Sequence, residues 1–140
     1  MWDRIFKPMD VMQRGLSASW MRNAVIRNNL ANIETPNFKA SYVEFESLLR
    51  KSLEEGSRTV GMKTHPKHVE VGRFRNRESF DDVRPLIRQS TEHSMRKDGN
   101  NVDIESENVR LAQNSIFYNT LMEKLNSEIR RLRMAISEGR

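Results

Sequence analysis

The chain has 140 residues, of which 36% are hydrophobic and 31% charged, with a formal net charge of +5 and a mean hydropathy of -0.75. This length fits about one domain, but so polar a composition disfavours a large private core. It favours partial disorder, or completion of the core by neighbouring subunits. The absence of cysteine excludes disulfides and thiolate metal sites. No stretch approaches the roughly 20 apolar residues of a membrane span, and the first residues lack the apolar run of a signal peptide.

An apolar pattern with alternating steps of three and four residues predicts a long amphipathic helix near the N-terminus. Its seam consists of Met9, Met12, Leu16, Ser19, Asn23, Ile26, Leu30 and Ile33. Pro8 suits the first turn of this helix, and Pro36 is expected to end it because Thr35 is pushed away from helical angles. The polar Ser19 and Asn23 either restrict register and partner number or mark a half-solvated surface seam.

A longer and more regular pattern closes the chain and predicts a second long helix. Its seam consists of Leu111, Ser115, Tyr118, Met122, Leu125, Ile129, Leu132 and Ile136, with Ile104 and Asn108 extending it backwards. Asp103 is the expected N-cap, directly after the turn at 98–101. Val109, Ile116 and Leu121 add apolar surface outside the seam. That surplus predicts contacts with more than one partner helix.

The middle of the chain is less regular, and the predicted fold class is mainly α with an irregular, β-containing middle. A short helix is expected over 42–55 with Gly56 as its stop. From 57 to about 97 the sequence shows short extended stretches, such as 69–71, without a confident set of strands. The predicted segments are 1–39 (long helix and Asn/Pro turn), 40–100 (short helix and partly extended region) and 101–140 (long helix).

No residue pattern supports catalysis or a cofactor. His65 and His68 have a metal-like spacing, but Pro66 between them forbids a regular helix and no acidic ligand adjoins the pair. His93 stands apart from both. The loop 98–103 lacks the sixth-position glycine of a calcium loop, so we interpret it as a turn leading into a helix cap. We therefore expect no enzyme activity, no cofactor, no metal and no small-molecule substrate.

The basic middle segment supports one alternative function, a small nucleic-acid-binding protein that uses the region from Lys63 to Arg77. Lys63, Lys67, Arg73, Arg75 and Arg77 surround Phe74 there. Single-strand binders use several aromatic stacking platforms, whereas this region offers one. The favoured expectation is therefore no nucleic-acid partner.

Residues 28–40 read Asn-Asn-Leu-Ala-Asn-Ile-Glu-Thr-Pro-Asn-Phe-Lys-Ala. Three asparagines within five residues exceed what helix capping requires, and amide side chains both donate and accept hydrogen bonds. They either end the helix or hold a neighbouring backbone. Residues 35–38 form a credible β-turn with proline in its second position.

This run resembles the N-terminal signature of the bacterial flagellar axial proteins of rod and hook. The usual signature reads Asn-Asn/Ile-Ala-Asn, two variable residues, then Thr-Pro-Gly-Tyr-Lys. The length, the segment 97–105 and the run Leu111-Ala112-Gln113-Asn114 with Tyr118 are most similar to the short proximal rod member of the family. The other short rod proteins are the alternative. Asn37 replaces the usual glycine, and Phe38 replaces tyrosine and its hydroxyl; asparagine is the next best residue at positive φ.

The resemblance implies a structural subunit of the proximal rod of the flagellar basal body, part of the drive shaft that transmits torque. It implies terminal helices packed as an inner coiled-coil layer, and export by the flagellar type III apparatus to the periplasmic rod without a cleaved signal. The implied partners are other copies, other rod proteins, and a basal-body adaptor that links the rod to the membrane ring and export gate. The predicted subunit interface comprises Met12, Leu16, Asn23, Ile26, Asn28, Asn29, Leu30, Asn32, Thr35, Pro36, Asn37, Phe38, Leu111, Tyr118, Met122, Leu125, Ile129, Leu132 and Ile136.

Overall fold

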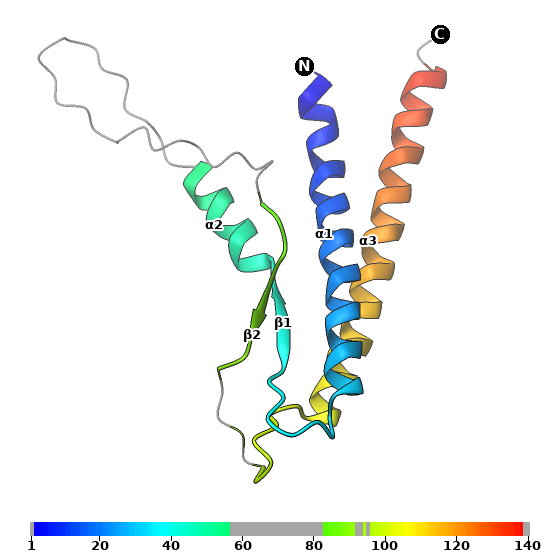
Figure 1. Cartoon of the computed structure of the whole chain (residues 1–140). Coiled ribbons are helices and arrows are strands. Elements are labelled where there is room, and N and C mark those ends of the chain that lie inside the picture. The colour runs from blue at the N-terminus through cyan, green and yellow to red at the C-terminus, as the bar shows by residue number, and fades with distance from the viewer. Residues whose placement is uncertain (1, 57–82, 92–93, 95, 139–140) are drawn as a thin grey trace, which may run out of the picture. The chain divides into compact units, whose positions relative to one another are not determined.

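The computed structural model describes residues 2–56, 83–91, 94 and 96–138. Its elements in chain order are α1 (Trp2–Ala31), β1 (Ser41–Glu44), α2 (Glu46–Gly56), β2 (Leu86–Gln89) and α3 (Ile104–Glu138). The predicted mainly α fold with two long terminal helices is confirmed (Figure 1). The predicted stretch at 69–71, the basic region 63–77 and the three histidines lie outside the described residues.

The chain divides into two compact units. The first contains Met1–Val43 and Pro85–Arg140, and the second contains Glu44–Arg84. In the first unit α1 and α3 lie side by side and antiparallel, so that the N- and C-termini are at the same end of the pair (Figure 1). None of the described helices combines the length and apolarity needed to cross a bilayer.

Small residues of α1 bring the two long helices close together. Gly15, Ala18 and Ser19 are buried, and a Cβ added at Gly15 would lie 3.0 Å from the Cδ1 atom of Leu121. The hydroxyl of Ser19 donates to the amide oxygen of Asn114 at 2.8 Å, and the amide of Asn114 donates back to the Ser19 carbonyl at 2.9 Å. The polar Ser19 is thus a buried partner for α3 within one chain.

The inward face of α1 is rotated from the predicted seam by about one residue. Its buried residues are Gly15, Ala18, Ser19, Val25, Ile26 and Asn29. The larger seam residues Met12, Leu16 and Leu30 are half-buried. Leu121 was predicted to lie outside the seam of α3. It instead packs on Gly15 of α1 and therefore belongs to the face of α3 that meets α1. The pattern of large apolar residues misled the prediction because close helix packing places small residues at the contact.

Both predicted ends of the first helix were wrong. α1 begins at Trp2, so Pro8 lies inside the helix and not in its first turn. The missing N–H of a proline removes one helical hydrogen bond, and the long helix continues on both sides of it. α1 also ends at Ala31, well before Pro36. The N–H of Asn32 is shared between the carbonyls of Asn28 and Asn29 at 3.2 and 3.1 Å, a tightening that is common at helix ends.

The predicted helix over 42–55 is correct only from residue 46 onwards. Residues 41–44 form β1, which pairs with β2 in a two-stranded sheet, and α2 ends at Gly56 as expected. The aromatic Tyr42 and the β-branched Val43 favour a strand over a helix. The N–H of Ser90 donates to the carbonyl of Ala40 at 2.7 Å, which makes the two strands antiparallel.

Candidate functional site: the asparagine-bound turn

The signature run forms a tight turn directly after α1. The N–H of Phe38 donates to the Thr35 carbonyl at 3.3 Å, which closes a four-residue turn with Pro36 in second position. Asn37, in third position, has a φ of 60°. A positive φ at the third residue defines a type II turn, where glycine or asparagine is needed. The structure confirms the predicted turn and explains why asparagine can replace glycine there.

The segment that precedes α3 lies against this turn and exchanges main-chain hydrogen bonds with it. The Asn37 N–H donates to the Asp98 carbonyl at 2.8 Å, and the Asn101 N–H donates to the Phe38 carbonyl at 3.3 Å. The Lys39 ammonium donates to the Gly99 carbonyl at 2.8 Å. The two sequence runs that carried the family resemblance, 28–40 and 97–105, are therefore neighbours in space.

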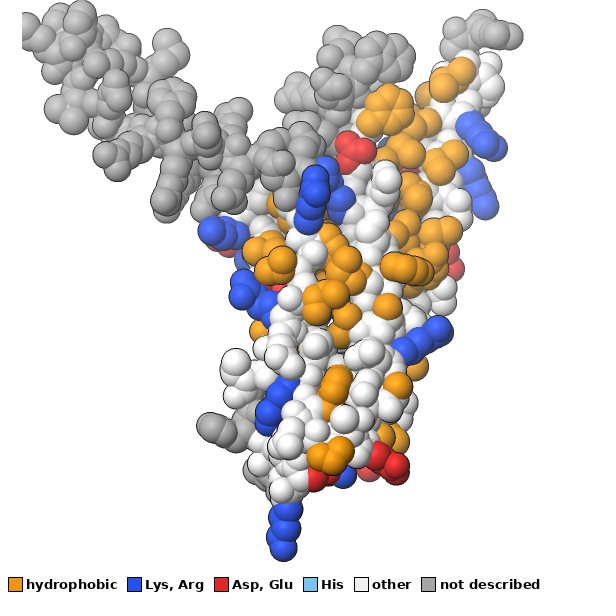
Figure 2. All heavy atoms as spheres, in the orientation of Figure 1, with side chains coloured by type: hydrophobic (Ala, Val, Ile, Leu, Met, Phe, Trp, Pro, Cys, Tyr) orange, Lys and Arg blue, Asp and Glu red, His pale blue; other side chains and the backbone are white. Residues whose placement is uncertain are grey.

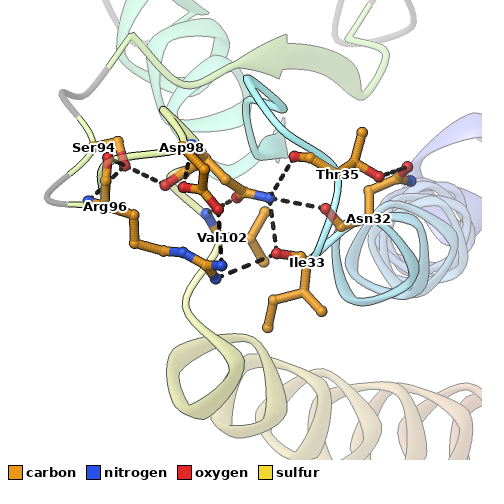
Figure 3. Close-up of polar contacts among 8 residues, drawn as sticks. Asn32, Ile33, Thr35, Ser94, Arg96, Asp98 and Val102 are labelled. Atoms are coloured by element: carbon orange, nitrogen blue, oxygen red, sulfur yellow. Dashed lines mark hydrogen bonds and ion pairs between the residues drawn. The ribbon is translucent and has the colours of Figure 1, made fainter.

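Asn100, in this segment, binds the turn that follows α1. Its side chain is fully buried, and its amide nitrogen donates to the carbonyls of Asn32, Ile33 and Thr35 at 2.9, 2.9 and 3.0 Å (Figure 3). Its amide oxygen accepts from the Val102 N–H at 2.7 Å. These three carbonyls lie in the turn beyond Ala31, the last residue of α1, so one side chain from elsewhere fixes the path of the turn.

Arg96 supports the same corner of the turn. Its guanidinium donates to the Ile33 carbonyl at 3.3 Å and lies 2.8 Å from the carboxylate of Asp98 (Figure 3). The hydroxyl of Ser94 accepts from the Arg96 N–H at 3.0 Å and donates to the carbonyl of Asn100. Residues 94 and 96–100 are thus bonded both to one another and to the turn that follows α1.

Asn29 fixes the chain that leaves the turn. Its side chain is fully buried; its oxygen accepts from the Ser41 N–H at 3.0 Å, and its nitrogen donates to the Ser41 carbonyl at 2.8 Å. Asn101 adds a bond from the Ala40 N–H to its amide oxygen at 2.7 Å. Both amides hold a neighbouring backbone, which is one of the two roles that the sequence left open for the asparagines at 28–32.

A buried carboxylate joins this corner to α3. Glu107 is 2% exposed, and its oxygens accept from the Asn29 amide at 3.2 Å and from the Arg110 guanidinium at 2.6 Å. A buried charge is costly unless it is paired and hydrogen-bonded, and Glu107 is both. Asn29, Asn100, Asn101 and Glu107 together are called the asparagine cluster below.

The structure separates the predicted site residues into three groups. Asn29 and Ile26 are buried within the chain, and the half-buried side chain of Asn32 bonds locally, donating to the Asn28 carbonyl at 2.8 Å and accepting from the Thr35 hydroxyl at 3.2 Å. The half-buried residues are Met12, Leu16, Asn23, Leu30, Phe38, Leu111, Met122, Leu125, Ile129 and Leu132. The exposed residues are Asn28, Thr35, Pro36, Asn37, Tyr118 and Ile136. Their role in a subunit interface stays a prediction.

Sequence reasoning missed Asn100, Asn101, Glu107 and Asn114. The first two were interpreted as an ordinary turn, although an asparagine pair there mirrors the pair at 28–29. Glu107 and Asn114 lie at helical spacing with Leu111 and Leu121. That spacing was the available signal that two polar residues belong to the inward face. The described residues contain no group of three or more His, Cys, Asp or Glu side chains that could hold a metal ion.

Asp103 is the N-cap of α3, as predicted. Its carboxylate accepts from the hydroxyl of Ser106 and from the N–H groups of Ser106 and Glu105, at 3.2 and 3.3 Å for the two N–H bonds. The Ser106 hydroxyl, followed by these N–H groups, lowers the pKa of Asp103 below its ordinary value of 3.8. A lowered pKa means that the folded state favours the charged carboxylate.

We expect the stability that this cap contributes to be fully present above pH 3.8 and lost as the pH falls through the lower folded-state pKa. Asp103→Asn keeps an oxygen acceptor but removes the titration. The difference in denaturation midpoint between Asp103→Asn and the unmodified chain should therefore stay constant above pH 3.8 and change as the pH falls below it. A difference that is independent of pH throughout would contradict the role of the charge.

Asn37 and Gly99 form a second testable pair. Gly99 has a φ of 73°, and a Cβ added to it would lie 2.6 Å from the Asn37 side-chain oxygen. We expect Gly99→Ala to lower the free energy of unfolding by about 1–2 kcal/mol through backbone strain, whichever residue stands at position 37. It should lose more when Asn37 is present, because the two side chains collide.

A double-mutant cycle with Asn37→Gly, followed by chemical denaturation, measures this coupling. Asn37→Gly alone should be tolerated, since glycine adopts positive φ readily. Additive effects of the two substitutions would contradict the predicted collision.

The chain is similar along most of its length to proteins named flagellar basal body rod protein FlgB. The relative from Bacillus subtilis is 36% identical over 129 residues, which cover 92% of each chain. The relative from Borreliella burgdorferi is 38% identical over 117 residues, 82% of this chain and 84% of the relative. The relative from Salmonella typhimurium is 27% identical over 143 residues, 99% of each chain. No protein-family model matches the chain.

These similarities identify the class to which the paired helices and the signature turn belong, the bacterial flagellar rod proteins. Within that class the chain belongs to the family of the flagellar basal body rod protein FlgB. The resemblance drawn from residues 28–40 and 97–105 is confirmed.

Proposed function

We propose that this chain is a non-enzymatic structural subunit of the proximal rod of the flagellar basal body, where it polymerises through its terminal helices. The observation that carries the proposal is the similarity, over most of the chain, to relatives whose names place them in the flagellar basal body rod. As part of that rod it would belong to the drive shaft that transmits torque. The asparagine cluster would hold the two helices of each subunit in register.

Exposed apolar side chains on the long helices support assembly through these helices. On α3, Ile116 is 68% exposed and Ile136 is 74% exposed; on α1, Trp20 is 73% exposed. Figure 2 shows apolar side chains along the helix pair, concentrated in the half nearer the termini. Val109, Ile116 and Met134 share one side of α3, because their separations correspond to nearly whole helical turns. Apolar surface of this kind typically marks a protein interface.

The proposed partners are other copies of this chain, other flagellar rod proteins, and a basal-body adaptor that links the rod to the membrane ring and export gate. The proposed route is secretion by the flagellar type III apparatus without a cleaved signal, followed by assembly in the periplasm. The subunit interface is proposed to use the exposed and half-buried members of the predicted set. Tyr118 and Ile136 are the members of that set on α3 whose side chains are most available.

The alternative, nucleic-acid binding through the region from Lys63 to Arg77, gains no support. The relatives named above are rod proteins, and that region lies outside the described residues. We do not propose it.

Deletion of the gene tests the proposed function. We expect loss of flagellar filaments and motility with the membrane ring retained, and recovery of both when the unmodified chain is expressed from a plasmid. Normal motility in the deletion strain would overturn the proposal. An export assay separates the proposed route from the proposed function. If the chain expressed from the plasmid is secreted but does not restore motility, export has worked and assembly has failed.

A further inference from the structure

The contacts between α1 and α3 differ between the two ends of the helix pair. Among the side chains that the structure describes, the buried ones of α1 lie between Gly15 and Asn29, and those of α3 lie between Glu107 and Asn114. Nearer the termini, the facing residues of both helices are half-buried or exposed. The pair is therefore tightly closed at the end next to the turn and loosely closed at the terminal end.

We propose that the asparagine cluster is a latch, which keeps the helix pair closed at the turn while the terminal end opens. The inference stands on the geometry of the first compact unit alone and does not depend on the proposed function. It assigns the signature run a role within each chain, whereas the sequence suggested a contact between chains.

The latched end is held by directional bonds that cannot be lost one at a time without exposing buried polar groups. Asn29 and Asn100 are fully buried, and between them their amides bond the backbone at Asn32, Ile33, Thr35, Ser41 and Val102. Glu107 ties Asn29 to α3 at 3.2 Å. A buried network of this kind is rigid when every member is satisfied.

The Ser19–Asn114 pair marks the limit of the latched end. Its two bonds, at 2.8 and 2.9 Å, join α1 directly to α3. Beyond it the described helices meet through Gly15 and Leu121, and then through a shallow groove of about 290 Å³. The groove is lined by Pro8, Met9, Glu128, Arg131, Leu132 and Ala135.

The composition of the surface changes in the same direction. Apolar side chains gather along the terminal half of the helix pair in Figure 2, while the half next to the turn is mostly polar on this face. Regions with few fully buried contacts open more readily than regions with many. Opening should therefore begin at the termini and stop at Ser19 and Asn114.

Hydrogen exchange on the full chain in dilute solution tests the latch directly. We expect amides of α1 at 18–29 to exchange at least about 100-fold more slowly than those at 9–14, with the matching contrast in α3 between 107–114 and 125–134. Asn100→Ala should reduce the contrast by at least about tenfold. Met9→Ala, at the terminal end, is the matched control and should leave the protection at 18–29 unchanged.

Because the chain lacks cysteine, pairs of spin labels can be attached cleanly. Arg27→Cys with Asn108→Cys reports the latched end, and Asp10→Cys with Ser127→Cys reports the terminal end; all four residues are exposed. The first pair should give a narrow distance distribution and the second a distribution at least twice as wide. Equal widths, or equal exchange at the two ends of the unmodified chain, would overturn the latch even if Asn100→Ala failed to fold.

Discussion

Asn100→Ala should destabilise the chain by about 3 kcal/mol, the largest loss that we expect from a single substitution outside the apolar contacts. The change removes the donor that serves the carbonyls of Asn32, Ile33 and Thr35, and the acceptor for the Val102 N–H. The Val102 N–H is left without its acceptor, at roughly 1–3 kcal/mol, and each of the three carbonyls loses one of two donors, because the Thr35 N–H, the Arg96 guanidinium and the Phe38 N–H still bond them. Since small domains have stabilities of about 5–15 kcal/mol, this is a large share.

Denaturation followed by the helical circular dichroism signal measures the loss, and two further variants define its cause. Asn100→Asp keeps an oxygen for Val102 but places a carboxylate against three carbonyls, so it should be at least as damaging as alanine. Asn28→Ala removes an exposed amide from the same signature run, and we expect a change within about 0.5 kcal/mol. If Asn100→Ala and Asn28→Ala had the same effect, the hydrogen bonds of the Asn100 side chain would contribute little to stability.

Ile116→Asp should abolish motility while leaving the isolated chain folded. Ile116 is 68% exposed on α3, so an aspartate there costs the single chain little beyond its weaker helix propensity. If the proposed assembly buries this side of α3, each subunit would carry an unpaired charge in an interface, at a cost of several kcal/mol by rough estimate. The same loss at every subunit of a polymer should prevent rod formation.

Complementation of a deletion strain measures motility, and a thermal melt of the purified variant measures folding. Asn119→Asp introduces the same charge at an exposed polar position of α3 and should swim normally. Leu125→Asp is a less clean probe, because Leu125 is half-buried against its own chain and its loss would weaken folding as well. A motile strain carrying Ile116→Asp would remove this side of α3 from the interface.

The long helices could be predicted from the sequence because a period of three and four residues needs only local information. Asp103 as the cap of α3 and the turn around Pro36 and Asn37 were also predictable, since both depend on short-range chemistry. The helix contact could not be predicted, because the residues of α1 that meet α3, Gly15 and Ser19, are small rather than apolar and large. Size becomes informative only when the partner helix is known.

The candidate site was half predictable. The asparagines at 28–32 were recognised as unusual, and the alternative in which amides hold a neighbouring backbone describes Asn29 correctly. The sequence did not indicate that their partner segment lies some 60–70 residues further along the chain. Asn100 and Glu107 contact residues 32 and 29 through long-range folding, which no local pattern encodes. Strand β1 was missed for a related reason, since its partner β2 is also far from it in the sequence.

The antiparallel pairing of β1 and β2 brings together the two points at which the middle segment joins the rest of the chain. The main chain leaves the paired strands at Glu44 and returns to them at Leu86, so the two junctions are close together. A segment inserted between neighbouring points adds little strain to its host, whatever its length. Substitution of residues 45–85 by a two-residue Asn-Gly hairpin turn should therefore leave the helix pair intact. The helix pair therefore sets no limit on the length of the segment that joins the two strands.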